Sequence, residues 1–231
     1  MTVAAVILAA TPDSALRAVE GVPNVRRLVD VAWAGGAVPV VVVAPDPEAA
    51  VRNALAGAPV TYAEPAPAEG GPVGQICRGF DVAVATVSET EAALVWPARM
   101  GWVDAETITS LIEAHGVDRL SVLRPGFAGR PGWPVLVPLA RLESLRGLPH
   151  ELMPDDLVVE LASRAPSRIV ELGDPGVTHS LDTPRDALPP FEGPTEPASG
   201  HGHEWGAQVA DRSDDAPLEG PSVARYEEPG V

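Results

Sequence analysis

Residues 3–44 read VAAVILAATPDSALRAVEGVPNVRRLVDVAWAGGAVPVVVVA and contain the pattern that decides the fold. Residues 3–10 and 38–44 are apolar almost throughout and are long enough for strands. Between them, residues 24–34 repeat apolar side chains at helical spacing and end at Gly35-Gly36. Strands that are apolar on both faces are typical of a parallel sheet covered by helices on each side. The segment therefore predicts a strand, a helix and a second strand of such a sheet.

The alternation of apolar runs and amphipathic stretches continues to residue 188. Further strands are expected at residues 60–63, 92–96, 120–123, 135–137 and 169–172. Further helices are expected at residues 47–55, 73–85, 103–115, 139–145 and 156–162. Asp104 is a candidate N-cap for the third of these helices. Together the elements indicate the α/β class, with a mostly parallel, Rossmann-like sheet that has helices on both faces.

The composition changes near Pro189. From there to Val231 the chain has nine acidic residues, two arginines and seven prolines, with few aliphatic side chains. Such a segment cannot bury enough apolar surface to offset the entropy lost on ordering. We therefore expect one α/β domain over residues 1–188 and an acidic, proline-rich, disordered tail over residues 189–231.

Charge and composition exclude several classes of partner and site. The formal net charge is −16, and all 16 basic residues are arginine. Nucleic acids and anionic membranes bind through basic faces, so neither is an expected partner. The single cysteine excludes an internal disulfide and any multi-cysteine metal site. No apolar run reaches the length of a membrane span, and residues 2–10 lack the basic start of a signal peptide, so we expect a cytoplasmic protein.

The loop after the first expected strand is one candidate ligand site, because doubly wound sheets bind ligands beyond the carboxyl ends of their strands. Residues 9–14 contain neither the glycines nor the lysine that a phosphate-binding loop needs. Arg17 is the nearest positive charge. An ordinary connection between a strand and a helix and a phosphate site both remain open for this loop.

Two further loops follow expected strands. Residues 69–75 are rich in glycine and open a helix, so their backbone N–H groups could meet a phosphate or a base edge, although Gly-Gly-Pro is also ordinary turn chemistry. After residues 92–96, a metal-dependent transferase would need a carboxylate to hold Mg²⁺. The chain has Arg99 in this loop, which could grip a phosphate but cannot bind a cation.

The closing segment, residues 173–186, contains three carboxylates. Asp182 stands before Thr183-Pro184, which is also a favourable arrangement for starting a helix, so capping is the alternative to a functional role. A packed or surface position is the simpler interpretation of His179. In the predicted tail, His201 and His203 could hold a metal only weakly, because no third ligand is near them in the sequence.

Taken in order, these pieces resemble the MobA/MocA-like nucleotidyltransferases, which attach a nucleotide to the molybdopterin cofactor. The resemblance covers roughly residues 3–188. It rests on ILAA at residues 7–10, EGVPNV at 20–25, GPVG at 71–74, VDAET at 103–107, GWPVL at 132–136, and the closing pair DPG at 174–176 and LDTPRD at 181–186. No single piece is specific, but their order and spacing are.

The resemblance implies a nucleotide site and shows how far this chain departs from it. In the family, a glycine-rich first loop ending in lysine holds the triphosphate, and an aspartate after the central strand holds Mg²⁺. Here Ser14 stands at the lysine position and Arg99 at the aspartate position. The same resemblance implies Asp182 and Arg99 as the candidate catalytic residues. The candidate nucleotide-binding residues are Ala10, Thr11, Arg17, Gly71, Pro72 and Gly74.

Three possible functions follow from this pattern. The first is a divergent transferase that takes a nucleotide from an NTP, with Mg²⁺ as its cofactor if it is active. The second is a catalytically inactive homologue that serves as a binding or scaffold protein, and a sugar- or cofactor-binding module is a weaker third reading. A triphosphate brings about four negative charges, and each charge-assisted contact to it contributes about 1.5–3 kcal/mol. The lost lysine and aspartate favour the inactive homologue, whereas the retained Gly71–Gly74 and Asp182 segments favour the transferase. A nucleotide or nucleotide-like small molecule is the expected partner in either case.

Overall fold

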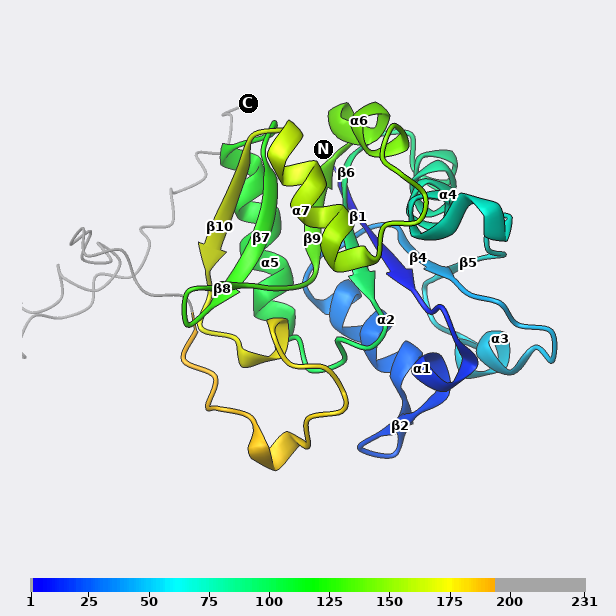
Figure 1. The fold of residues 1–231 in the computed structure, drawn as a ribbon. Coiled ribbons are helices and arrows are strands. Elements are labelled where there is room, and N and C mark those ends of the chain that lie inside the picture. Colours follow the sequence, from blue (N-terminus) through cyan, green and yellow to red (C-terminus); the bar gives the residue numbers. More distant parts are fainter. Residues whose placement is uncertain (1, 194–231) are drawn as a thin grey trace, which may run out of the picture. The chain divides into compact units, whose positions relative to one another are not determined.

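The computed structural model describes residues 2–193 (Figure 1). Its strands are β1 Thr2–Leu8, β2 Ala18–Val19, β3 Val22–Pro23, β4 Val40–Val43, β5 Thr61–Ala63, β6 Thr90–Pro97, β7 Val122–Phe127, β8 Arg130–Pro131, β9 Val135–Pro138 and β10 Ser167–Glu171. Its α-helices are α1 Pro12–Leu16, α2 Asn24–Ala34, α3 Ala50–Ala54, α4 Gly71–Thr86, α5 Ala105–Val117, α6 Leu142–Arg146 and α7 Pro154–Arg164. Short 3₁₀ helices are η1 Ala68–Gly70, η2 Leu139–Arg141, η3 Pro175–Val177 and η4 Arg185–Ala187.

One sheet organises the domain. Its strand order is β10-β7-β9-β6-β1-β4-β5, with β8 paired to β7. The pairs β1–β4, β1–β6, β4–β5 and β7–β10 are parallel, whereas β9 runs antiparallel to both β6 and β7. The short strands β2 and β3 form a separate hairpin. The predicted fold class, a mostly parallel sheet in an α/β domain, is confirmed.

Helices cover both faces of the sheet (Figure 1). On one face, α4 contacts β1 and β4, α6 packs on α4, and α7 packs on α6. On the other face, α2 contacts β1 and β4, and α5 contacts α2 and β7. A side chain at Gly79 would overlap Val6, so this glycine lets α4 lie close against the central strand. Because β1, β4 and β6 are parallel, the loops that follow them lie at the same edge of the sheet.

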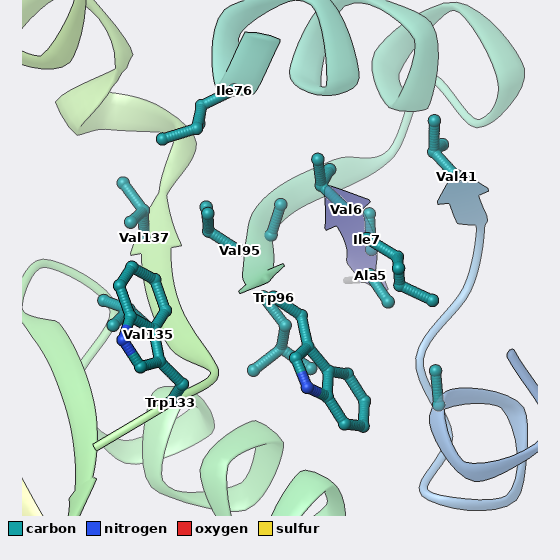
Figure 2. Close-up of a cluster of buried hydrophobic side chains, with 14 of the residues drawn as sticks. Ala5, Val6, Ile7, Val41, Ile76, Val95, Trp96, Trp133, Val135 and Val137 are labelled. Atoms are coloured by element: carbon teal, nitrogen blue, oxygen red, sulfur yellow. The ribbon is translucent and has the colours of Figure 1, made fainter. Parts of the chain in front are cut away.

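The core is built on the apolar runs of the sequence. The side chains from Val3 to Ile7 in β1 are buried, and so are all four valines of β4. Trp96 and Phe80 are the largest residues with no exposed surface, and Figure 2 shows Trp96 beside the side chains of β1 and β9. The Trp96 indole N–H donates to the carbonyl of Met100 at 2.9 Å, so its one polar atom is satisfied. Burial on both faces explains why these strands show no alternation.

One expected helix cap is confirmed, whereas several other expectations about the elements differ from the structure. Asp104 caps α5 as predicted, because its carboxylate accepts the Glu106 N–H at 3.0 Å. Residues 47–49 precede α3 rather than forming its first turn, and residues 120–121 precede β7. Trp33, placed on the apolar side of α2 by its spacing, is 49% exposed. The loop after β1 contains α1 and the β2–β3 hairpin. Neither was predicted, because such short elements show no clear periodicity in the sequence.

The described residues continue to Gly193, beyond the predicted domain boundary at residue 188. Residues 189–193 lie within the described part, and the Glu192 N–H donates to the carbonyl of Gly173 at 3.1 Å. Residues 194–231, including His201 and His203, lie outside the described residues. The disordered tail therefore stays a prediction. Within the described part of the chain, no helix is both long enough and apolar enough to cross a membrane.

Candidate functional site

A pocket of about 630 Å³ lies at the carboxyl ends of β1, β4 and β6. Its walls come from these strand ends, from the start of α1, from the start of α4 and from the start of α7. The lining residues are Leu8, Ala9, Ala10, Thr11, Ser14, Val43, Pro45, Pro65, Gly71, Pro72, Gln75, Pro97, Ala98, Arg99, Met153, Pro154 and Asp155. The position agrees with the general rule for open α/β sheets.

The pocket brings five of the predicted site residues together. Ala10 and Thr11 come from the loop after β1, Gly71 and Pro72 from the first turn of α4, and Arg99 from the loop after β6. The other predicted residues, Arg17, Gly74 and Asp182, are not among the lining residues. The structure therefore joins the three loops that sequence reasoning singled out, but it leaves part of the predicted residue set outside them.

Charge in the pocket is sparse. Arg99 and Asp155 are the only charged residues among the lining side chains, and they form an ion pair at 2.9 Å. The second carboxylate oxygen of Asp155 accepts the indole N–H of Trp133 at 2.8 Å. Most of the remaining wall consists of alanine, valine, leucine, methionine and proline. The pocket is thus mostly apolar, with one ion pair among its lining residues.

A second arginine lies near this ion pair. Arg124, in β7, is partly buried, and burial lowers the pKa of its guanidinium while the negative charge of Asp155 opposes the shift. Its Nε is buried and has no hydrogen-bond partner among the described residues. Asp155 therefore interacts with two positive charges. It contacts Arg99 directly, and its charge also acts on Arg124 at longer range.

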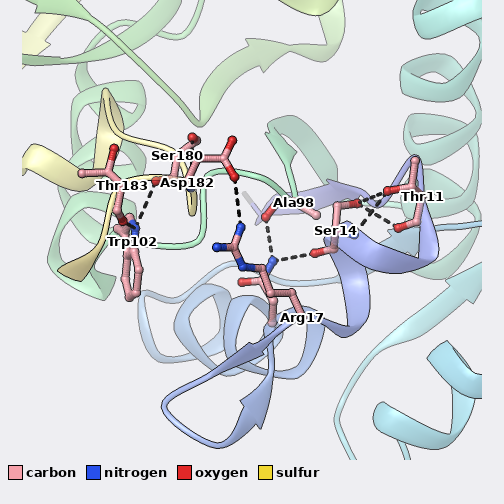
Figure 3. A network of polar contacts seen from close by, with 9 residues as sticks. Thr11, Ser14, Arg17, Ala98, Trp102, Ser180, Asp182 and Thr183 are labelled. Atoms are coloured by element: carbon pink, nitrogen blue, oxygen red, sulfur yellow. Dashed lines mark hydrogen bonds and ion pairs between the residues drawn. The ribbon is translucent and has the colours of Figure 1, made fainter.

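The first loop has the hydrogen bonding of a helix start (Figure 3). The Thr11 hydroxyl accepts the Ser14 N–H at 3.2 Å, and the Ser14 hydroxyl donates to the Thr11 carbonyl at 2.8 Å. The buried side chain of Asn24 donates to the carbonyls of Ser14 and Ala98, at 2.9 and 2.7 Å. These bonds fix the loop in the geometry of a connection from strand to helix.

Arg17 and Asp182 form an ion pair with each other, and neither lines the pocket. Their ion pair is 3.0 Å long, and the two side chains are 51% and 89% exposed (Figure 3). The alternative role of Asp182 as a helix cap is wrong, because η4 begins at Arg185 after Pro184 and receives no side-chain cap. The Trp102 indole N–H instead holds this segment through the carbonyls of Ser180 and Thr183, at 3.1 and 3.0 Å.

The glycine-rich loop contributes backbone shape. Gly71 has φ +54°, a conformation that side chains disfavour, and an added Cβ would overlap the carbonyl oxygen of His150. The neighbouring lining residue Gln75 is not free, because its amide bonds both the N–H and the carbonyl of Ala66, at 2.8 and 3.0 Å. This loop therefore shapes the wall and offers few polar side-chain atoms to a ligand.

Asp155 was missed as a lining residue, and Trp133 and Arg124 were missed as residues that interact with it. Asp155 precedes the predicted helix 156–162, and in the structure α7 begins at Pro154, so the missed first turn hid it. The Pro154-Asp155-Asp156 run was a usable signal for that helix start. Trp133 was quoted only as part of a motif, and nothing in the sequence places Arg124 beside Asp155.

Asp174 in the closing segment is a structural residue. It is buried, and its carboxylate accepts the N–H groups of Asp104 and Gly176 and the hydroxyl of Thr107, at 3.0, 2.7 and 2.7 Å. Burial raises the pKa of Asp174, and the three donated hydrogen bonds oppose the rise. The group ties the closing segment to the start of α5.

The described carboxylates do not suit the Mg²⁺ that the resemblance implies. Mg²⁺ requires oxygen ligands in near-octahedral geometry. Arg99 stands where the family aspartate is expected, Asp155 is engaged by Arg99 and Trp133, and Asp182 pairs with Arg17. Residues 2–193 contain no cluster of three or more His, Cys, Asp or Glu that could hold a metal ion. We therefore assign no residue of this part of the chain to the metal.

Solved structures with the same fold include nucleotidyltransferases. Rv0371c from Mycobacterium tuberculosis H37Rv, in complex with manganese, is 20% identical with a TM-score of 0.59 over 81% of this chain and 98% of that chain. The nucleotidyl transferase Mth528 from Methanothermobacter thermautotroptrophicus is 18% identical, with a TM-score of 0.61 over 74% of this chain and 87% of that one. The 2-C-methyl-D-erythritol 4-phosphate cytidylyltransferase from Thermus thermophilus is 20% identical, with a TM-score of 0.59 over 81% and 96%.

The family assignment comes from the sequence profile rather than from these distant structures. No curated protein matches the sequence. The profile of the MobA-like NTP transferase domain matches residues 9–163, which include every strand end and loop that lines the pocket except the end of β1 at Leu8. The likeness to the solved structures, all at low identity, shows the fold. The chain belongs to the MobA-like NTP transferase family.

Proposed function

We propose that this chain is a catalytically inactive NTP transferase homologue that binds a nucleotide-like small molecule in its pocket. The observation that carries the proposal is the charge of the lining residues, where one arginine is already paired with one aspartate. The resemblance to the MobA/MocA-like nucleotidyltransferases and the match to the MobA-like NTP transferase domain support a ligand related to a nucleotide or to molybdopterin.

The triphosphate of an NTP needs more positive charge than these residues have free. It carries about four negative charges, and each charge-assisted contact with a phosphate contributes about 1.5–3 kcal/mol. Arg17 could supply such a contact only by leaving Asp182, and Arg99 only by leaving or sharing Asp155. Losing several contacts removes both affinity and transition-state stabilisation, so the residues support binding of a less charged ligand better than nucleotide transfer.

The active transferase is the alternative, and one observation favours it. Asp155 places a carboxylate in the pocket wall, and a related fold has been crystallised with manganese. If ligand binding displaced Arg99, Asp155 could become available to a metal. This alternative predicts Mg²⁺-dependent binding of an NTP and release of pyrophosphate.

Calorimetry of the full chain with GTP, CTP and ATP, each with and without Mg²⁺, separates the two. We expect weak NTP binding that Mg²⁺ does not strengthen, and no pyrophosphate release with molybdopterin present. An NTP that binds more tightly with Mg²⁺, or any pyrophosphate release above a heat-denatured control, contradicts the proposal.

A gain-of-binding variant tests the physical cause. Ser14 lines the pocket at the position where the resemblance places the family lysine. Ser14→Lys should strengthen NTP binding about tenfold, because it adds one charge-assisted phosphate contact. Ser14→Gln is the matched control, since it loses the same Ser14 hydrogen bonds and adds length without charge. Equal affinities of the two variants would show that missing positive charge is not what weakens NTP binding.

A further inference from the structure

We infer that the ligand of this pocket is uncharged and mostly apolar, and that the Arg99–Asp155 pair binds an edge of it on which a hydrogen-bond donor stands next to an acceptor. The inference rests on the proposed function and names the ligand class for the same site. A lactam, in which an N–H lies beside a carbonyl, is the simplest group with such an edge. The chemistry therefore points to an uncharged heterocycle rather than to the phosphates of a nucleotide.

The lining residues carry no net charge. Arg99 and Asp155 are the only charged residues among them, and the guanidinium donates to the carboxylate at 2.9 Å. An anion at Arg99 would lie next to the carboxylate that Arg99 already neutralises, and a cation at Asp155 would lie next to the guanidinium. Arg124 offers a ligand no donor, since it is not among the lining residues. A charged ligand would therefore lose hydration without gaining a free partner of opposite charge.

The ion pair nevertheless keeps hydrogen-bonding capacity that a ligand can use. Arg99 directs one guanidinium nitrogen at Asp155 and another at the sulfur of Met100, a weak acceptor 3.5 Å away, so N–H donors remain. The two oxygens of Asp155 accept one hydrogen bond each, from Arg99 and from the Trp133 indole, and each oxygen has a second lone pair. The side chains of Arg99 and Asp155 are 45% and 66% exposed, so a ligand can reach these atoms. The pair thus offers a donor and an acceptor side by side.

The rest of the wall suits an apolar body. Met153 lines the pocket and is 63% exposed, so an apolar ligand would cover a flexible side chain that solvent now reaches. The polar lining residues Thr11, Ser14 and Gln75 already bond within the chain. The volume of about 630 Å³ is ordinary for a small-molecule site that has apolar walls and few polar groups. The other apolar lining residues are Leu8, Ala9, Ala10, Val43, Pro45, Pro65, Pro72, Pro97, Ala98 and Pro154.

Three bicyclic probes of similar size test the ligand class: carbostyril, its N-methyl derivative and naphthoate. Carbostyril is an uncharged lactam, N-methylation removes its only hydrogen-bond donor, and naphthoate is an anion. In calorimetry with the full chain, we expect carbostyril to bind about tenfold more tightly than either of the others, because only carbostyril bonds both members of the pair. If either of the other probes binds as tightly as carbostyril, the inference is overturned.

The indole N–H of Trp133 locates the bound probe, because it donates to Asp155. Its NMR signal in the full chain can be identified with the variant Trp133→Phe. We expect carbostyril to shift this signal. A signal that millimolar carbostyril leaves unchanged also overturns the inference.

The variant Asp155→Asn tests whether the ion pair is what excludes charged ligands. Without the carboxylate the charge of Arg99 is free, so naphthoate should bind about tenfold more tightly than to wild type, and carbostyril about fivefold more weakly. Asp156→Asn is the matched control, because it removes the neighbouring carboxylate in the first turn of α7, which does not line the pocket. Both probes should bind this control within about twofold of wild type.

Two results with these variants contradict the role of the ion pair. One is a naphthoate affinity that does not rise in Asp155→Asn, and the other is an equal rise in Asp156→Asn. Mg²⁺-dependent NTP turnover would instead refute the proposed function, whichever way the carbostyril series comes out. A failed carbostyril series together with weak, Mg²⁺-independent NTP binding refutes the ligand class alone.

Discussion

His115 lies near the end of α5, and neither of its buried ring nitrogens has a hydrogen-bond partner among the described residues. Burial lowers the pKa of this imidazole below its ordinary value of 6.5, although Glu91 opposes the shift. In the unfolded chain the group takes up its proton near 6.5, whereas the folded chain resists protonation. Stability is therefore lost as the pH falls below about 6.5.

His115→Leu should remove this pH dependence. At pH 7.5 we expect the variant to be about 1–2 kcal/mol more stable than wild type, since two unpaired buried nitrogens disappear. Its advantage should grow towards pH 5.5, by at most roughly 1.4 kcal/mol per pH unit. Urea unfolding at several pH values measures both effects. His150→Gln, at an exposed site, is the control, and an advantage of His115→Leu that stays constant with pH would contradict the assignment.

At the scale of one element, the start of α4 depends on a glycine that sequence reasoning assigned to ligand binding. Gly71 has φ +54° and lies against the backbone of His150. Gly74 lies one turn into the helix, where an added Cβ would meet only the Ala66 side chain, at an ordinary contact distance. Both were predicted as nucleotide-binding residues, but only the Gly71 position has a backbone conformation and a close contact that require glycine.

The variants Gly71→Ala and Gly74→Ala test this difference, because they should change the stability in opposite directions. Gly71→Ala should destabilise the fold by about 2–3 kcal/mol, because alanine is strained at that φ and its Cβ would overlap the His150 carbonyl. Gly74→Ala should stabilise by about 0.5–1 kcal/mol, because alanine favours a helix interior. Urea unfolding gives both values. A Gly71→Ala variant as stable as wild type would mean that the start of α4 adapts freely.

For the whole molecule, the buried apolar cluster lies between Val3 and Val177. The compact unit that contains it ends at Thr195. A chain that ends at Thr195 should therefore unfold with the same free energy as the full chain, within about 0.5 kcal/mol. The full-length chain is the control, and urea unfolding is the measurement. A loss above about 2 kcal/mol would show that the acidic segment contributes to folding, against the prediction of a disordered tail.

The sheet was predictable from local pattern, and its irregular parts were not. Residues 24–34 form α2 as expected because apolar spacing and Gly35-Gly36 point to the same structure. The antiparallel direction of β9 has no local signal, since its residues are buried on both faces like those of the parallel strands. Helix α1 was missed because it is only five residues long and begins at a proline after Thr11.

The candidate site was predictable as three loops but not as a set of contacts. Ala10, Gly71 and Arg99 belong to loops at strand ends, and the rule for parallel sheets brings those ends together. The partner of Arg99 is Asp155, 56 residues later in the chain. The partner of Arg17 is Asp182, 165 residues away. No spacing in the sequence specifies either pairing.

The amino-acid sequence by itself determined an α/β domain of the NTP transferase family, because apolar runs, helix stops and motif order are local properties. It also determined that no lysine could serve a phosphate. Only the tertiary structure decided how the arginines are used, because neutralisation depends on which carboxylate lies within about 3–4 Å, and that distance is set by folding rather than by sequence separation.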